Sequence, residues 1–349
     1  MITKIEPCQA PMFQIAWEST LKCNLDCSYC GDGHDNSQPH PSLEDSLKTV
    51  DFIADYVGFY MKSKPESQRQ ANLNIQGGES IFHPHIIEIL EYARNKEVDY
   101  QLYVNLITNA VTKPESWKRI AELVNYFTLS FHAESLERQQ EQFRTNALHL
   151  KEVGKGFHVA VLMHPRHWQA CTAMVEWCKQ NDIKHVIRQI DHDPSDTRFD
   201  YTKEQAEYIV PVKIDTSAID LSSQGRACCG GLEMCTNESA STKYIQGNNF
   251  QGWHCSVNKF FLYIRQSTGE VFTNKDCKMN FDGEVGPIGN LSESELILER
   301  LTQGVDDIVC KKSRCWCGLC APKAQSREDY ITIMKRYELD PATADQNPL

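Results

Sequence analysis

The chain has 349 residues, of which 41% are hydrophobic and 24% are charged, as in ordinary globular proteins with a substantial core. The net charge of −11 makes broad binding to nucleic-acid phosphates unlikely as a function. We find no apolar run long enough to cross a bilayer and no signal peptide, and we therefore expect a cytoplasmic protein without a membrane partner.

Segments typical of strands and helices alternate between residues 12 and 200. The first strand is expected at 13–17, and Ser42 is expected to cap a helix whose apolar positions recur at helical spacing as far as Met61. Further strands are expected at 72–76, 101–108, 126–131, 157–163 and 184–190, and helices at 84–96, 115–124, 135–153 and 168–181. This alternation predicts an α/β fold with a parallel sheet or an incomplete barrel, in which functional sites gather at the carboxyl ends of the strands.

Fifteen cysteines are many for a reducing compartment, where thiolates serve metal binding or chemistry more often than disulfides. Three lie between residues 23 and 30, and nine lie between residues 228 and 320. Cys171 and Cys178 stand apart on an expected helix, where we interpret them as small core residues.

The first expected strand leads into a loop in which Cys23, Cys27 and Cys30 have the spacing Cys-x3-Cys-x2-Cys. Three thiolates on a short loop can bind three irons of a cubane cluster and leave the fourth iron open to chemistry. The alternatives are a zinc site or three buried thiols. Zinc normally takes four ligands in paired Cys-x2-Cys spacing, so this loop favours an iron–sulfur cluster.

This loop resembles the signature of the radical S-adenosylmethionine (SAM) superfamily, with Tyr29 at the aromatic position before the third cysteine, and the resemblance covers roughly residues 12–190. The resemblance implies a partial (β/α)6 barrel that carries a [4Fe–4S] cluster and SAM. It further implies that reductive cleavage of SAM gives a 5′-deoxyadenosyl radical, which abstracts hydrogen from the substrate.

Other strand ends carry related motifs. Gln76-Gly77-Gly78-Glu79 resembles the family's Gly-Gly-Glu motif, with Ser80 in place of the usual proline, and Thr108-Asn109 resembles Thr-Asn-Gly, with Ala110 in place of glycine. The resemblance assigns SAM contacts to Tyr29, Gly77, Gly78, Glu79, Asn109, Ser130 and Gln189. For Asn109 and Ser130, a role as strand-terminating turn residues is an equal alternative. Arg188 and Gln189, on the sixth expected strand, could reach the carboxylate or the adenine of SAM, and for Arg188 a structural ion pair is an equal alternative.

The chain changes character near residue 205. We expect a barrel domain over 1–205 and a smaller α+β, cysteine-rich extension with its linker over 206–349. Within the extension, strands at 259–265 and 270–274 are expected to form a hairpin around Ser267-Thr268-Gly269, followed by a helix at 292–302.

The extension resembles the twitch or SPASM domains of radical SAM enzymes, which carry auxiliary clusters. The order of its cysteines implies one auxiliary [4Fe–4S] cluster on Cys255, Cys277, Cys317 and Cys320, with Cys315 as the alternative to Cys317. A zinc knuckle is the competing interpretation. Four other cysteines stay unassigned, namely Cys228, Cys229, Cys235 and Cys310.

The favoured function is a radical SAM enzyme that oxidises or rearranges a small metabolite or a short peptide and receives electrons from a flavodoxin or ferredoxin. A maturase acting on peptides or proteins is one alternative, and a non-catalytic zinc or iron–sulfur protein that binds a partner is another. His132, His164 and His192 follow strand ends, but lone histidines more often serve as hydrogen-bonding residues, so the catalytic residues stay undetermined.

Overall fold

The structure is a computed structural model that describes nine segments of the chain, namely residues 4–5, 12–30, 34–190, 197–209, 226–227, 249–275, 277–305, 307–311 and 321–336. Six parallel strands follow one another across its larger sheet in chain order. They are β2 (Phe13–Glu18), β3 (Gln70–Gln76), β4 (Gln101–Thr108), β5 (Tyr126–Phe131), β6 (Gly156–Met163) and β7 (His185–Gln189). The six expected strands and the α/β fold class are therefore confirmed.

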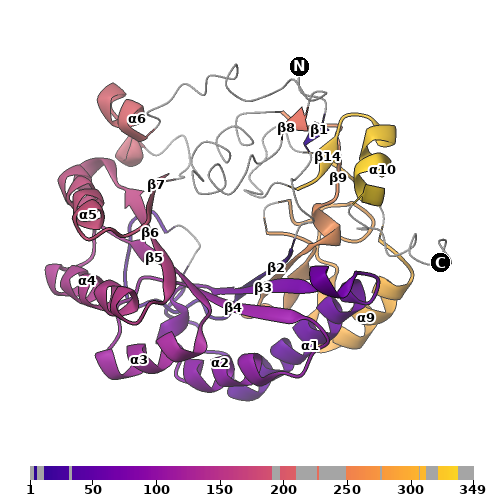
Figure 1. Cartoon of the computed structure of the whole chain (residues 1–349), viewed down its shortest axis with the longest axis horizontal. Helices are drawn as coiled ribbons and strands as arrows, with labels where there is room; N and C mark the ends of the chain where they lie inside the picture. The colour runs from indigo at the N-terminus through magenta and orange to yellow at the C-terminus, as the bar shows by residue number, and fades with distance from the viewer. Residues whose placement is uncertain are drawn as a thin grey trace.

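Helices connect these strands and lie on the outer, convex face of the curved sheet (Figure 1). They are α1 (Leu43–Met61), α2 (Ile86–Asn95), α3 (Pro114–Leu123), α4 (Glu137–Glu152) and α5 (Trp168–Gln180). As expected, Ser42 caps α1, because its side chain accepts a hydrogen bond from the Asp45 N–H. The arrangement is that of a partial (β/α)6 barrel.

The two faces of the sheet differ in polarity. Side chains alternate along a strand, and those facing the helices are apolar and fully buried, among them Ile15, Leu73 and Leu106. Cys171 and Cys178 on α5 are also fully buried in this core, as expected. The alternate positions face the concave side, and several of them are polar and half-buried, among them Gln14 and Asn74. The concave face therefore offers polar groups in front of a dry core.

The expected hairpin is present as β10 (Phe261–Arg265) and β11 (Glu270–Phe272), and the sheet ends with β12 (Gly289–Asn290). β11 is shorter than expected because the Asn274 side chain accepts hydrogen bonds from the N–H groups of Cys277 and Lys278, which begins a turn. β10 pairs in parallel with β2, which makes one nine-stranded sheet, and this pairing was not predicted from the sequence. The cysteine loop therefore leaves a strand that is central rather than at an edge.

A smaller, five-stranded sheet lies beside this hairpin. Its strands are β1 (Lys4–Ile5), β8 (Arg226–Ala227), β9 (His254–Cys255), β13 (Ile308–Val309) and β14 (Lys323–Ala324). Among the residues described, the other α-helices are α6 (Lys203–Ile209), α9 (Ser294–Thr302), which was expected, and α10 (Arg327–Arg336). Lys4 of β1 forms an ion pair with Asp329 of α10, which ties the two ends of the described chain together.

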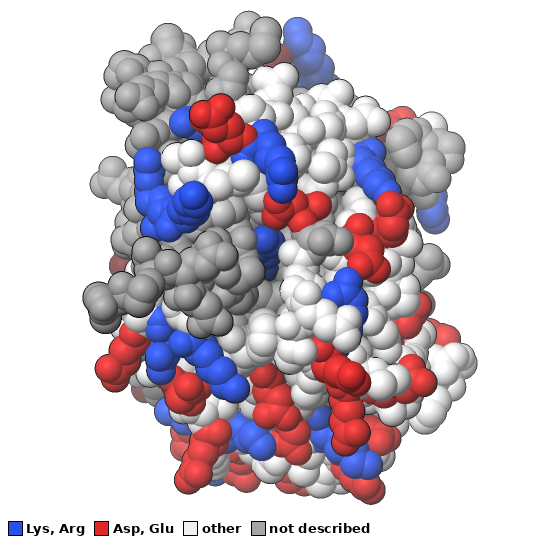
Figure 2. Space-filling model, turned by 90° about the vertical axis from the view of Figure 1, so that its right-hand side faces the viewer, with Lys and Arg blue, Asp and Glu red and all other residues white. Residues whose placement is uncertain are grey.

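Charge is well mixed on the face that carries α1, α9 and α10. Figure 2 shows acidic and basic side chains interspersed there, without a continuous basic groove across the residues described. None of the helices that the structure describes combines the length and the apolar character needed to span a membrane.

Candidate active site

The loop that carries Cys23, Cys27 and Cys30 leaves β2 and runs along the end of β3. Three backbone hydrogen bonds join the two segments: the Ser19 N–H donates to Gln76 O, the Gly78 N–H to Thr20 O and the Glu79 N–H to Lys22 O, each at 2.8 Å. Two segments that are more than fifty residues apart in the chain therefore form one layer at the mouth of the barrel.

Gly77 and Gly78 make this close approach possible. A β-carbon on Gly77 would lie 2.3 Å from Thr20 O, and one on Gly78 would lie 2.5 Å from both Leu21 O and Lys22 O. Ordinary carbon contacts are about 3.5 Å. The glycine pair therefore lets β3 and the cysteine loop pack backbone to backbone.

The three thiols are half-buried at the surface of this layer. Burial raises the pKa of Cys23 to about 11 and that of Cys27 to about 12, and it also raises the pKa of Cys30. Each thiol is therefore protonated near neutral pH in the metal-free chain, and a metal must displace those protons. Cys23 and Cys27 both interact electrostatically with Cys30, so the three sulfurs lie within mutual electrostatic reach.

Glu79 connects β3 with the end of β4 rather than standing open at the surface. Its carboxylate accepts hydrogen bonds from the Asn109 N–H at 2.5 Å and the Ile81 N–H at 3.1 Å, and the residue is only 2% exposed. Burial raises the pKa of Glu79 to about 7. Asn109 in turn donates from Nδ2 to Asn24 Oδ1 at 2.7 Å, within the cysteine loop. Glu79 and Asn109 thus hold the loop from the side of β4.

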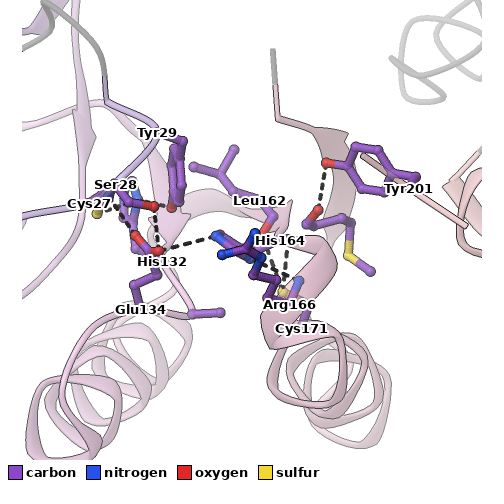
Figure 3. Close-up of polar contacts among 12 residues, drawn as sticks. Cys27, Ser28, Tyr29, His132, Glu134, Leu162, His164, Arg166, Cys171 and Tyr201 are labelled. Atoms are coloured by element: carbon purple, nitrogen blue, oxygen red, sulfur yellow. Dashed lines mark hydrogen bonds and ion pairs between the residues drawn. The ribbon is translucent and has the colours of Figure 1, made fainter. Parts of the chain in front are cut away.

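The loop is held from the opposite side by two residues that follow β5 (Figure 3). Glu134 accepts from the Ser28 N–H at 2.7 Å and from the Ser28 hydroxyl at 2.6 Å. Burial acts to raise the pKa of Glu134, but these bonds, together with the nearby His164, keep it below its ordinary value. His132 lies 2.8 Å from the Tyr29 hydroxyl, measured from Nδ1.

His164, which follows β6, supports Glu134. Its Nδ1 accepts a hydrogen bond from the Arg166 N–H at 3.1 Å, so the proton of the neutral ring is on Nε2. That Nε2 lies 3.1 Å from the Glu134 carboxylate, and His164 is only 2% exposed. His164 therefore serves as a buried hydrogen-bonding residue behind the loop.

Residues 17–188 match the model of the Radical SAM superfamily, and this range runs from the end of β2 through the cysteine loop and into β7. The chain carries a radical SAM domain. It is an enzyme of the radical SAM class, so the alternative of a non-catalytic zinc or iron–sulfur protein is not supported.

Solved structures of radical SAM enzymes have the same fold. SuiB from Streptococcus suis, bound to S-adenosylmethionine, is 13% identical with a TM-score of 0.51, over 86% of this chain and 67% of SuiB. The anSMEcpe structure with bound AdoMet is 14% identical with a TM-score of 0.51, over 97% of this chain and all (100%) of the other. Its complex with AdoMet and the Kp18Cys peptide gives 13% identity, a TM-score of 0.52 and the same coverage, 97% and 100%. No curated protein matches the chain.

The radical SAM family implies a [4Fe–4S] cluster and SAM, and the donor set of the cysteine loop fits such a cluster. Cys23, Cys27 and Cys30 supply three thiols on one loop, and polar side chains already hold that loop from both sides. Asn36 Oδ1 accepts from the Cys23 N–H at 2.9 Å, which fixes the first ligand position further.

The remaining predicted SAM contacts lie around the same mouth. Asn109 and the glycine pair adjoin the cysteine loop, as described above. Ser130 lies half-buried near the end of β5, and Gln189 is exposed at the end of β7. Gly77, Gly78, Glu79, Asn109, Ser130 and Gln189 thus all lie at carboxyl ends of parallel strands, and their contacts with SAM stay predictions.

Several residues of this site were not singled out from the sequence, namely Asn24, Asn36 and Glu134. Polar residues are common in the turns that follow strands, so these three residues could not be distinguished from ordinary turn residues. For Glu134 the sequence does contain an indication of a functional role, because Glu134 lies two residues after His132 at the end of an expected strand.

The cysteines of the extension are only partly described. Cys255 lies on β9, and Cys255, Cys277 and Cys310 are all buried. Cys315, Cys317, Cys320, Cys228, Cys229 and Cys235 fall outside the described residues, as does His192.

Proposed function

We propose that this radical SAM enzyme holds its [4Fe–4S] cluster on Cys23, Cys27 and Cys30. The observation that carries the proposal is the three-thiol loop at the barrel mouth, which is hydrogen-bonded to the ends of β3, β4 and β5. When bound, the cluster and SAM supply a 5′-deoxyadenosyl radical that abstracts a hydrogen atom from the substrate. The chain orients SAM and keeps water from the radical.

The groups nearest the loop have distinct proposed parts. Gly77 and Gly78 bring the end of β3 against the loop, and Asn109 holds Asn24 within it. Ser130 and Gln189 supply polar contacts to SAM from the other strand ends. Tyr29 presents its ring beside the third ligand position, where it can pack against the adenine.

Amide side chains on the concave face point to a neutral, polar substrate. Gln14 Oε1 accepts from Asn72 Nδ2 at 3.4 Å and from Asn74 Nδ2 at 3.3 Å. Asn105 Nδ2 donates to both asparagines at 3.4 Å. These bonds are long, and all four residues are half-buried, so the amides are available to exchange partners with a ligand.

A small metabolite or a short peptide suits this surface, because both offer hydrogen-bond donors and acceptors without a large net charge. We infer that such a substrate is oxidised or rearranged within the barrel. Peptide or protein maturation is the second candidate. The amide-lined face favours it, since peptide groups bond well with amides, and one similar fold, anSMEcpe, was solved with a peptide.

The substrate class can be tested by hydrogen transfer. Anaerobic reactions with perdeuterated cell metabolites in one pool and perdeuterated short peptides in another should place deuterium in 5′-deoxyadenosine from one pool. Transfer from neither pool, but from an intact folded protein, would contradict the proposed substrate size.

We also propose one auxiliary [4Fe–4S] cluster on Cys255, Cys277, Cys317 and Cys320. Cys255 pairs with Lys323, which follows Cys320 by three residues in the sequence, and the Ser256 N–H donates to Pro322 O at 3.1 Å. The Cys310 N–H donates to Trp253 O at 2.8 Å, which brings a further cysteine beside β9. Strand pairing therefore brings several cysteine-bearing segments together around β9.

Iron content separates one cluster from two. Two cubane clusters correspond to about eight irons per chain, and Cys255→Ala or Cys277→Ala should lower the count towards four. Cys171→Ala, which changes a buried cysteine in the barrel core, is the matched control and should keep the full count. Zinc in place of iron in the extension would contradict the auxiliary cluster.

The proposed function also requires an external electron donor, because the cluster must be reduced before each cleavage of SAM. We propose a flavodoxin or ferredoxin and a cytoplasmic location. Reduction of the reconstituted protein by a flavodoxin system, followed through the loss of cluster absorbance, is the direct test.

A further inference from the structure

Three polar groups meet beside the end of β5: the Cys27 thiol, the Tyr29 hydroxyl and the His132 ring (Figure 3). The Tyr29 hydroxyl lies close enough to Cys27 for the two groups to interact electrostatically. His132 Nδ1 lies 2.8 Å from the Tyr29 oxygen and 3.5 Å from Cys27 Sγ. Cys23 Sγ has different donors, since it accepts from the Leu25 N–H at 3.4 Å and lies 4.0 Å from Asn109 Nδ2.

Counting donors fixes the direction of these hydrogen bonds. A metal-bound thiolate only accepts, and a tyrosine hydroxyl, with an ordinary pKa of about 10, keeps its proton near neutral pH. Its single O–H is therefore available to donate to a Cys27 thiolate. The bond between Tyr29 and His132 then requires the hydrogen to be on Nδ1 of the imidazole, which donates to the tyrosine oxygen.

The surrounding rings hold this arrangement in place before any metal binds. The Tyr29 ring lies nearly parallel to His132, with 6.0 Å between centroids and 12° between planes. It also contacts His164 at 5.7 Å and the edge of Phe199 at 6.2 Å. One residue away, Glu134 clamps Ser28. Rotation of the tyrosine away from Cys27 would have to break these contacts together.

We propose that Tyr29 and His132 form a hydrogen-bonded relay that raises the reduction potential of the cluster on Cys27. The proposal rests on the proposed function, which makes Cys27 a ligand. Reduction adds one electron to the cluster, taken from the external donor, and transfers no proton. The added charge is shared with the thiolates, and hydrogen bonds to a ligand sulfur stabilise the more negative form. His132 contributes both through Tyr29 and from its own Nδ1, which lies 3.5 Å from Cys27 Sγ.

The test is the midpoint potential of the cluster in the reconstituted full chain, followed by electron paramagnetic resonance. The relevant signal is the one that changes when SAM is added. Tyr29→Phe keeps the ring but removes the O–H, and His132→Ala removes the second donor, so both variants should have a more negative potential than the wild type. His132→Asn places an amide N–H near the position of Nδ1 and should recover part of the shift.

Phe199→Leu is the matched control, since it weakens the packing on Tyr29 without removing a donor. Its potential should equal that of the wild type. Unchanged potentials in both Tyr29→Phe and His132→Ala would overturn the relay while leaving the proposed function intact. A wild-type chain that assembles no cluster on the cysteine loop would overturn both.

A measurement on the wild type alone covers variants that load iron poorly. The reduced cluster should show an exchangeable proton by electron–nuclear double resonance, and that signal should disappear after transfer to D2O. If no exchangeable proton couples to the cluster, Tyr29 does not donate to its sulfur and the relay is wrong.

Discussion

Replacing Gly78 by alanine tests whether the glycine pair positions the cysteine loop. The new β-carbon would lie 2.5 Å from Leu21 O and from Lys22 O, and 2.8 Å from the Leu21 carbonyl carbon. All of these atoms are backbone, so the loop itself must move by about 1 Å to reach an ordinary contact distance. The thiols of the same loop move with it.

Two effects of Gly78→Ala lower the free energy of unfolding. Overpacking of this kind costs about 1–3 kcal/mol. The movement also strains the hydrogen bonds from Gly78 N–H to Thr20 O and from Glu79 N–H to Lys22 O, each worth about 1 kcal/mol. We therefore expect Gly78→Ala to lower the free energy of unfolding by about 2–4 kcal/mol and to reduce the iron that the cysteine loop binds.

Gly58→Ala is the matched control for this variant. Gly58 lies within α1, where an added β-carbon meets no atom within 4 Å. Alanine there should raise the free energy of unfolding by about 1 kcal/mol through helix propensity. Urea unfolding of the metal-free chains, with iron analysis after anaerobic reconstitution, measures both effects. Equal stability and equal iron content in the two variants would refute the role assigned to Gly78.

Three further variants test the supports of the site by urea unfolding. Burial raises the pKa of Glu79 from an ordinary 4.5 to about 7. Protonated Glu79 therefore contributes stability below pH 4.5 that is lost as the pH rises through 7. Relative to Glu79→Gln, the wild type should lose up to about 3 kcal/mol across that window, and parallel pH profiles would contradict this. Ala110, at φ 55° and fully buried, should tolerate valine poorly, with a loss of about 1–3 kcal/mol; an unchanged midpoint would argue against strain there. Asn146→Ala removes the donor to the buried Ala110 O, while Thr112 O keeps its hydrogen bond from Gln142 Nε2, and it should cost about 2 kcal/mol. A loss below about 0.5 kcal/mol would show that water replaces the Asn146 amide.

The strands and helices of the barrel were predicted well because each is indicated by residues that are neighbours in the chain. Ser42 and apolar residues at helical spacing indicate the helix from Leu43 to Met61. Each parallel strand is indicated by apolar residues at alternate or consecutive positions next to a turn. Such patterns depend on neighbours in the chain, so one sequence is enough to find them.

The pairing of β10 with β2 could not be predicted in this way, because the two strands are far apart in the sequence. Tyr263 pairs with Ala16 across nearly two hundred and fifty residues, and nothing in either strand specifies the other as partner. The alternation of side chains indicates which face is buried, but not which strand lies alongside.

The same limit applies to the site. The spacing of Cys23, Cys27 and Cys30 was enough to predict a cluster loop. The clamp by Glu134 was not foreseen, because only the fold brings the end of β5 to Ser28. Ala110 shows a related effect. The motif has glycine at this position in the family, and the structure keeps the left-handed backbone at φ 55° although alanine has replaced it.

The most direct test of the central claim is the formation of 5′-deoxyadenosine by anaerobically reconstituted protein given SAM and a strong reductant. The wild type should produce it, and so should Cys178→Ala, which alters a cysteine buried in the core far along the chain from the loop. The triple variant Cys23→Ala, Cys27→Ala, Cys30→Ala should produce none, although iron remains in the extension. Undiminished 5′-deoxyadenosine from the triple variant would contradict the assignment of the cluster to this loop.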